Sequence, residues 1–101
     1  MKIVNEKEFE SEIKKGLVLV DFFATWCGPC RMMGGILEEI DEELSKKAKI
    51  IKVNVDDCEK VARKFGIMSI PTIILFKDGK EVEKHIGLMQ RDDLIKWVEK
   101  Y

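Results

Sequence analysis

Residues 17–24 constrain the fold of this chain more than any other segment. Apart from Asp21 they are all apolar, and half of them are β-branched or aromatic. A run of this kind is typical of a strand that is buried on both faces. Such a strand requires helices on both sides of its sheet, so the segment favours a layered α/β fold.

The remaining segments alternate between strand and helix patterns. Strands are expected at residues 1–4, 49–55, 72–77 and 81–86, and Asp78-Gly79 joins the last two as a hairpin turn. Helices are expected where apolar residues recur three and four positions apart: Phe9 and Ile13 between Asn5 and Gly16; Met33, Ile36, Leu37, Ile40 and Leu44; Val61, Ala62 and Phe65 before Gly66; and Leu94, Ile95 and Val98. This order predicts a mixed sheet with helices on its faces.

Length, charge and hydropathy exclude several classes of protein. The chain is long enough for one domain over residues 1–101, and its 46% apolar composition excludes a disordered chain. The 18 Lys and Arg nearly balance the 19 Asp and Glu, which disfavours nucleic-acid binding through a basic surface. No apolar run exceeds four residues, so no membrane span is expected. The acidic N-terminal segment lacks the apolar stretch of a secretion signal, which predicts a cytoplasmic protein.

A cysteine pair, Cys27-Gly28-Pro29-Cys30, stands between the expected buried strand and the helix after it. The first turn of a helix presents unpaired N–H groups and the positive end of the helix dipole. A thiolate is stabilised there, so the pKa of Cys27 is expected below the ~8.5 of a free cysteine. Pro29 suits the first helical turn, Gly28 leaves room for a docking substrate, and Trp26 offers an apolar wall beside Cys27.

Three interpretations of this cysteine pair are open on spacing alone. A zinc site would need two further ligands, and only Cys58 and His85 remain, neither of them in a second paired motif. A structural disulfide across four residues would constrain little of the unfolded chain. The placement at a strand-to-helix turn favours the third interpretation, reversible thiol–disulfide exchange.

The sequence resembles the thioredoxin family along essentially its whole length. The resemblance is carried by Val20-Asp21-Phe22-Phe23-Ala24-Thr25-Trp26-Cys27-Gly28-Pro29-Cys30, by Ile70-Pro71-Thr72 and by Phe76-Lys77-Asp78-Gly79. It implies the thioredoxin fold, an α/β fold with a central five-stranded mixed sheet flanked by four helices. It also implies a monomeric, general protein disulfide reductase that keeps cellular thiols reduced, uses neither cofactor nor metal, and is re-reduced by a thioredoxin reductase.

The same resemblance implies two consecutive exchange reactions. Cys27 attacks a substrate disulfide as a thiolate and forms a mixed disulfide; Cys30 then attacks the Cys27 sulfur and releases the reduced substrate. One rival hypothesis is a disulfide oxidant or isomerase on the same fold. Those relatives tend to carry histidine between the cysteines, whereas Gly28-Pro29 favours the reducing kind. The other rival is a binding module whose cysteines are incidental.

Asp21 and Lys52 each interrupt an otherwise apolar strand. Opposite charges on neighbouring strands can compensate each other, although each side chain could instead emerge at a strand end. In the thioredoxin family the residue that matches Asp21 lies beneath the active site and assists proton removal from the second cysteine, here Cys30. Burial is then expected to raise the pKa of Asp21 towards neutrality, and Lys52 would tune that pKa by opposing the rise.

Pro71 opens an expected strand, and the ordinary peptide bond between Ile70 and such a proline is trans. In the thioredoxin family the matching bond is cis and lies beside the cysteines, and the backbone of Ile70 would pair with a substrate peptide as an added strand. Seven residues match the apolar docking surface of the family: Trp26, Gly28, Pro29, Ile70, Pro71, Ile86 and Gly87. A core position is an equally good interpretation for Ile86.

Several residues depart from the family pattern. Gly35 stands where thioredoxins usually carry proline and follows Gly34, so a softer but intact helix is expected. Phe23 replaces the more usual tryptophan, and Arg31 replaces a lysine. We expect the exchange activity to be retained despite these changes. The exact reduction potential does not follow from the family pattern.

The other residues of possible chemical interest have simpler interpretations. Cys58 is expected to be a passive thiol at the surface or half-buried, because neighbouring acids disfavour its thiolate. His85 is expected to be an exposed polar residue at a strand end, and Met33 is expected in the core.

Overall fold

The apolar segment at residues 17–24 forms β2 (Leu17–Phe23), the central strand of a five-stranded sheet. In the computed structural model, which describes residues 1–101, the strand order is β1-β3-β2-β4-β5. The bounds of the other strands are β1 Lys2–Ile3, β3 Lys49–Asn54, β4 Thr72–Lys77 and β5 Lys80–Ile86. β3 runs parallel to β2 and to β1, β4 runs antiparallel to β2, and β5 antiparallel to β4, which confirms the predicted mixed sheet.

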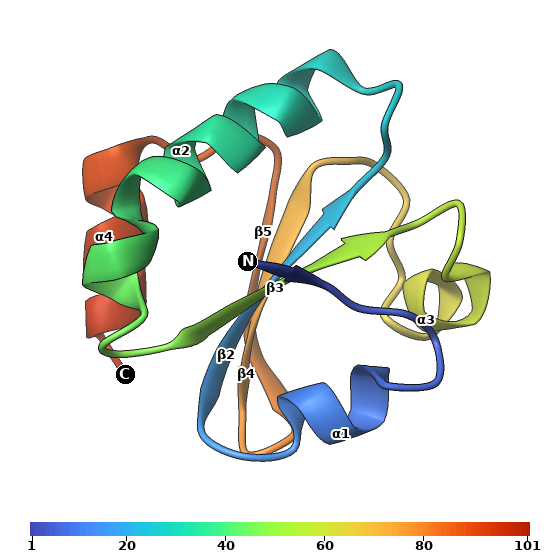
Figure 1. Cartoon of the computed structure of the whole chain (residues 1–101), viewed down its shortest axis with the longest axis horizontal. Helices are drawn as coiled ribbons and strands as arrows, with labels where there is room; N and C mark the ends of the chain where they lie inside the picture. The colour runs from blue at the N-terminus through green and yellow to red at the C-terminus, as the bar shows by residue number, and fades with distance from the viewer.

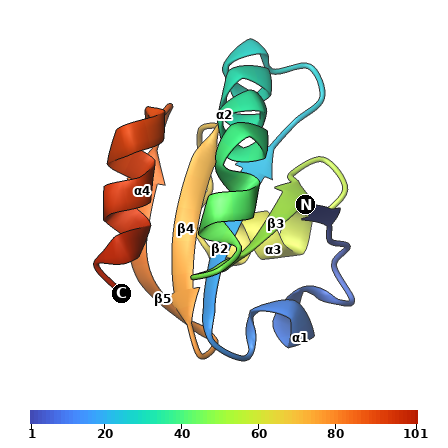
Figure 2. The same ribbon diagram turned by 60° about the vertical axis from the view of Figure 1, so that its left-hand side comes forward.

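The protein has four helices. They cover both faces of the sheet (Figure 1 and Figure 2). α2 (Gly28–Leu44) and α4 (Arg91–Glu99) lie on one face, and α1 (Phe9–Ile13) and α3 (Glu59–Lys64) lie on the other. The thioredoxin fold that the sequence implied is therefore confirmed in its strand number, helix number and mixed sheet. No helix combines the length and the apolar character that a membrane crossing requires.

The alternation of side chains along β2 divides the core into two halves. Val18, Val20 and Phe22 pack with α1 and α3, whereas Leu19 packs with α2 and α4. Because side chains two residues apart share a face, Asp21 and Phe23 point to the α2 side of the sheet with Leu19. The central strand thus carries one acidic side chain into the layer directly beneath the helix that follows the cysteines.

The turns around the sheet follow the sequence expectations, with one shift. Asn5 and Glu8 exchange backbone-to-side-chain hydrogen bonds of 2.9 and 3.0 Å, but these close a turn, and α1 itself begins only at Phe9. The hairpin between β4 and β5 turns at Asp78 and Gly79, which have φ angles of 51° and 87°. Positive φ at both positions matches the twist of a two-residue hairpin, as the Asp-Gly pair predicted.

Candidate active site

Cys27 and Cys30 lie where β2 gives way to α2, and their sulfur atoms are at disulfide-bonding distance. Their Cα atoms are 5.2 Å apart, because Cys27 is the N-cap of α2 and Cys30 belongs to its first turn. Pro29 occupies the first turn, where a missing N–H leaves no hydrogen bond unmade. The predicted placement of the pair at a strand-to-helix turn is confirmed.

The sulfur of Cys27 accepts a hydrogen bond from a backbone group of the helix. The N–H of Cys30 points at it over a distance of 3.2 Å. α2 is the longest helix of the protein, with 17 residues, and its positive end lies at Cys27. The N–H donor and the helix dipole both favour negative charge on this sulfur. Cys27 and Cys30 are 6% and 3% exposed, so Cys30 is the more enclosed of the two.

A loop that is distant in the sequence, at Ile70 and Pro71, completes the surroundings of the cysteines. The Ile70–Pro71 peptide bond is cis, as the resemblance implied, and Ile70 packs against the cluster that contains both cysteines. The Ile70 carbonyl oxygen lies 3.9 Å from the Cys27 sulfur. The N–H of Gly87 donates to the Pro71 carbonyl at 2.8 Å and ties the end of β5 to this loop. The fold thus brings the Cys27 loop and the Ile70-Pro71 loop together.

Two large apolar side chains of the expected docking surface are open to solvent. Trp26 is 68% exposed and Ile86 is 63% exposed, so the core alternative for Ile86 is wrong. The indole N–H of Trp26 donates to the carboxylate of Asp56 at 2.8 Å, a contact that the sequence analysis missed. Asp56 lies two residues after the end of β3, and it comes beside Trp26 because β3 runs parallel to β2 and ends at the same edge of the sheet. Met68, two residues before Ile70, is 96% exposed and was also not singled out.

Asp21 and Lys52 are register partners on β2 and β3, so they lie side by side and point to the same face of the sheet. Asp21 is fully buried in the interior of its strand, which makes the strand-end interpretation wrong for it. Burial raises the pKa of Asp21 to about 6, and the positive charge of Lys52 opposes the rise. Both expected directions are therefore confirmed.

The predicted compensation between the two charges is, however, looser than an ion pair. None of the five ion pairs of the protein involves Lys52, and no group hydrogen-bonds to either carboxylate oxygen of Asp21. The Lys52 ammonium lies instead 4.5 Å from the centre of the Phe23 ring. An ammonium over an aromatic face gains a cation–π attraction, which holds Lys52 near Asp21 without contact.

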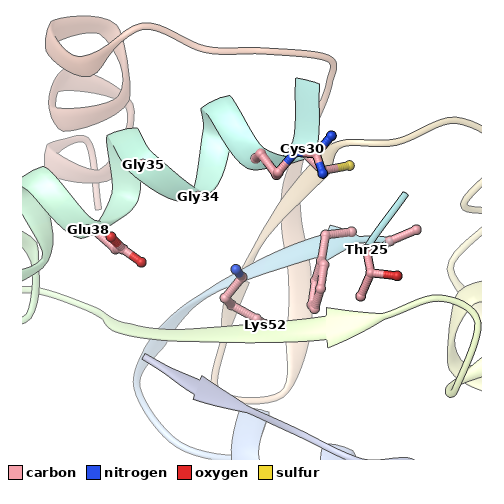
Figure 3. Close-up of a pocket in the computed structure, with 9 residues that line it drawn as sticks. Thr25, Cys30, Gly34, Gly35, Glu38 and Lys52 are labelled. Carbon is pink, nitrogen blue, oxygen red and sulfur yellow. The ribbon is translucent and has the colours of Figure 1, made fainter. Parts of the chain in front are cut away.

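A cavity of about 390 Å³ opens between α2 and the β2–β3 edge, next to Cys30 (Figure 3). Lys52 rises into it from β3 towards Gly34. A Cβ atom at Gly34 would lie 3.5 Å from the Lys52 ammonium, and one at Gly35 would meet nothing within 4 Å. The complete lining comprises Phe23, Ala24, Thr25, Cys30, Arg31, Gly34, Gly35, Glu38 and Lys52. α2 runs through both glycines without a break, so the helix is intact as predicted.

The third cysteine and the histidine lie away from the pair. Cys58 is fully buried, more so than predicted, and its thiol donates to the Val4 carbonyl at 3.6 Å. Burial raises the pKa of this thiol, and the carboxylates of Glu6 and Asp57 add to the rise. His85 is half-buried against Trp97, so the prediction of an exposed residue is wrong. No cluster of His, Cys, Asp and Glu in the chain is large enough to hold a metal ion.

Comparison with known proteins agrees with this geometry. The family model described as thioredoxin matches residues 1–100. A thioredoxin of Chlamydia caviae is 48% identical over 101 residues, which cover 100% of this chain and 98% of the relative. A thioredoxin of Listeria monocytogenes is 46% identical with the same coverage. A thioredoxin of Bacillus subtilis is 44% identical over 96 residues, which cover 95% of this chain and 92% of the relative.

Proposed function

The chain belongs to the thioredoxin family and is a protein-disulfide oxidoreductase that works by dithiol–disulfide exchange, and we propose that Cys27 is its attacking thiolate and Cys30 its resolving thiol. The N–H of Cys30 that points at the Cys27 sulfur is the single observation that carries this assignment. It stabilises negative charge on Cys27 before attack and on the same sulfur when it later leaves.

The proposed reaction consists of two consecutive thiol–disulfide exchanges. The Cys27 thiolate attacks one sulfur of a substrate disulfide, and the other substrate sulfur leaves with the electron pair and takes a proton from solvent. Cys30, as a thiolate, attacks the Cys27 sulfur of the mixed disulfide and expels the second substrate sulfur. The substrate gains two electrons, and Cys27 and Cys30 become a disulfide. Because the Cα atoms of the two cysteines are only 5.2 Å apart, the second step is intramolecular.

We assign to Asp21 the removal of the proton from Cys30. The carboxyl group lies under α2, has no hydrogen-bonding partner, and has its pKa raised to about 6 by burial. A base with a pKa near the working pH is ionised often enough to accept a proton and is basic enough to hold it. Lys52, beside Asp21 in the sheet, keeps that pKa from rising further and thereby tunes the base.

Substrate docking is assigned to the exposed apolar surface around Cys27. Its exposed residues are Trp26, Gly28, Pro29 and Ile86; Ile70 and Gly87 beside them are half-buried, and Pro71 is buried. Its support is the exposure of Trp26 and Ile86 together with the position of the Ile70 carbonyl beside the Cys27 sulfur. An extended peptide that flanks a disulfide would pair with the backbone of Ile70 and pack its side chains on the apolar residues.

The biological setting follows from the chemistry of the pair. A general reductase must itself be re-reduced, and we assign that task to a thioredoxin reductase. A monomer in the cytoplasm suits this role, because a partner copy on the docking surface would block substrates and because a reducing compartment keeps thiols reduced.

Reduction of a protein disulfide such as that of insulin, driven by dithiothreitol, tests the assignment of roles. Cys27→Ser is expected to abolish catalysis without forming a mixed disulfide. Cys30→Ser is expected to accumulate the mixed disulfide at Cys27, visible by mass spectrometry. Cys58→Ser is the matched control and should retain full activity. Trapping at Cys30 in the Cys27→Ser variant instead would reverse the roles, and full activity of both variants would leave the binding-module hypothesis in place.

A further inference from the structure

The loop that carries Ile70 and the cis Pro71 has few hydrogen bonds of its own. Between the end of α3 and the start of β4, the N–H groups of Met68, Ser69 and Ile70 donate to no carbonyl of the protein. Within the loop, the hydroxyl of Thr72 donates to the Ser69 carbonyl at 2.6 Å. Contacts at the two ends of the loop therefore matter for where Ile70 lies.

The first end of the loop is the C-terminus of α3, which closes in a Schellman motif. The N–H of Gly66 donates to the Arg63 carbonyl at 3.1 Å. The N–H of Ile67 donates to the Ala62 carbonyl at 2.9 Å. Gly66 has a φ of +65°, the left-handed conformation that this motif requires. These two bonds leave the carbonyl of Phe65, between them in the chain, without a backbone donor.

Lys84 of β5 supplies the missing donor. Its ammonium donates to the Phe65 carbonyl at 2.6 Å and lies at the negative end of the α3 dipole. A Cβ atom at Gly66 would lie 3.9 Å from the same ammonium, so the lysine closes over the turn as well. No ion pair of the protein involves Lys84. The charge-assisted bond to Phe65 is thus the contact that fixes this side chain.

β5 also holds the second end of the loop. The N–H of Gly87, the residue after β5, donates to the Pro71 carbonyl at 2.8 Å. Lys84 and Ile86 are two residues apart on β5, so their side chains point to the same face of the sheet. This face is the one on which Ile74, the register partner of Lys84, packs with α1 and α3. One strand therefore holds both ends of the loop and presents Ile86 beside it.

We propose that Lys84 is a positioning residue for substrate reduction, whose bond to the Phe65 carbonyl holds the Ile70–Pro71 loop where a substrate peptide docks. This inference rests on the docking proposed at Ile70. A loop that must be ordered during docking subtracts from the affinity, whereas a loop that is already held does not. Loss of the bond should weaken docking and spare the exchange steps, because both reacting sulfurs lie at the start of α2.

Steady-state reduction of a protein disulfide tests the effect on docking. Lys84→Met keeps the aliphatic stem and removes the donor, and it is expected to raise KM roughly three- to five-fold at an unchanged kcat. Lys84→Arg keeps a charged donor and should bring KM back towards the wild-type value. Lys80→Met, which removes another exposed lysine of β5, is the matched control. Equal KM values for Lys84→Met and Lys80→Met, or a fall in kcat alone, would overturn the role of Lys84.

Amide hydrogen exchange in the free, oxidised protein tests whether the bond acts on the whole loop. The N–H of Ile67 reports on the end of the loop at α3, and the N–H of Gly87 reports on the end at β5. Both are expected to exchange roughly three-fold faster or more in Lys84→Met than in Lys80→Met. Faster exchange at Ile67 with unaltered exchange at Gly87 would confine the bond to the end of α3 and refute the positioning role.

A trapped complex separates this role from the docking on which it rests. Cys30→Ser protein is joined through Cys27 to a cysteine-containing peptide, and exchange of the Ile70 N–H is compared with that in the free protein. Slower exchange in the complex is expected, because the peptide pairs with this backbone. Unaltered exchange would refute docking at Ile70, and the role of Lys84 with it. Slower exchange beside a wild-type KM in Lys84→Met would refute the role of Lys84 alone.

Discussion

Asp21 and Lys52 sit in register on adjacent parallel strands, yet the ammonium of Lys52 lies over the Phe23 ring, and the carboxylate of Asp21 remains unpaired. An ionisable group that is buried without a partner favours its neutral form, and this bias must appear in the pH dependence of stability. The fold sets the pKa of Asp21 through burial and through the nearby charge of Lys52, and the proposed proton transfer from Cys30 depends on that pKa.

Replacement of Asp21 by asparagine is expected to stabilise the protein at alkaline pH. The pKa of Asp21 rises from an ordinary 3.8 to about 6 in the folded protein, chiefly through burial. A raised pKa means that the carboxyl group favours folding fully below pH 3.8, and that this contribution is lost as the pH rises through 6. Asp21→Asn should thus be more stable than the wild type by about 3 kcal/mol at pH 8.

Urea denaturation of the oxidised proteins at several pH values measures this difference. The advantage of Asp21→Asn should shrink steadily between pH 7 and pH 4. A constant difference across that range would show that Asp21 titrates as an ordinary carboxylate in the folded protein.

Alanine at either interior glycine of α2 is expected to stabilise the helix. Gly34 and Gly35 lie inside the helix, and a Cβ atom at each is accommodated. Glycine is about 1 kcal/mol less favourable than alanine at such positions, which corresponds to a rise in Tm of roughly 4–8 °C for a chain of this size. Gly16→Ala is the control of opposite sign, because Gly16 has a φ of +71°. Thermal scans that show no rise for Gly35→Ala would contradict the prediction of a softened helix.

Removal of the Asp56 carboxylate is expected to weaken substrate reduction. The indole of Trp26 is held by its 2.8 Å hydrogen bond to Asp56, and Asp56→Ala frees the ring to move. The loss of one such hydrogen bond is worth about 1 kcal/mol, so kcat/KM for a protein disulfide should fall roughly five-fold. Asp57→Ala, at the next residue, is the matched control. Equal kcat/KM values for these two variants would exclude a role of the Trp26–Asp56 contact.

A polar residue at Ile86 is expected to raise KM and leave kcat unaltered. Ile86 is exposed at the end of β5 and is assigned to docking only, so Ile86→Ser should raise the KM for a protein disulfide roughly three- to ten-fold. Val82→Ser, at another exposed apolar position of β5, is the control. A fall in kcat at constant KM would place Ile86 in the chemical step instead.

Local structure was the part of the fold that the sequence predicted best. The apolar run of β2, the Asp78-Gly79 turn and the placement of Cys27 at a helix start all follow from backbone and burial preferences that act over a few residues. Motif resemblance added the cis bond before Pro71 and the burial of Asp21, which spacing alone left open.

Contacts between distant segments were the part that the sequence did not predict. The bond from Trp26 to Asp56 depends on where β3 ends relative to β2, and the position of Lys52 depends on the space above the Phe23 ring. Opposite charges on neighbouring strands suggested that Asp21 and Lys52 compensate each other, but the Lys52 ammonium lies over the Phe23 ring and forms no ion pair with Asp21. The cavity beside Cys30 likewise brings Gly34 and Gly35 of α2 together with Lys52 of β3, and no local sequence pattern marks this arrangement.

The reactivity of Cys27 as a function of pH tests the central claim most directly. The reduced Cys58→Ala protein is treated with iodoacetamide between pH 4 and pH 10, and alkylation of Cys27 and Cys30 is followed separately by mass spectrometry. Because the Cys30 N–H and the α2 dipole stabilise the anion, Cys27 should react faster than Cys30, with half-maximal reactivity well below the ~8.5 of a free cysteine. Half-maximal reactivity at or above that value, or equal rates at the two cysteines, would contradict the account.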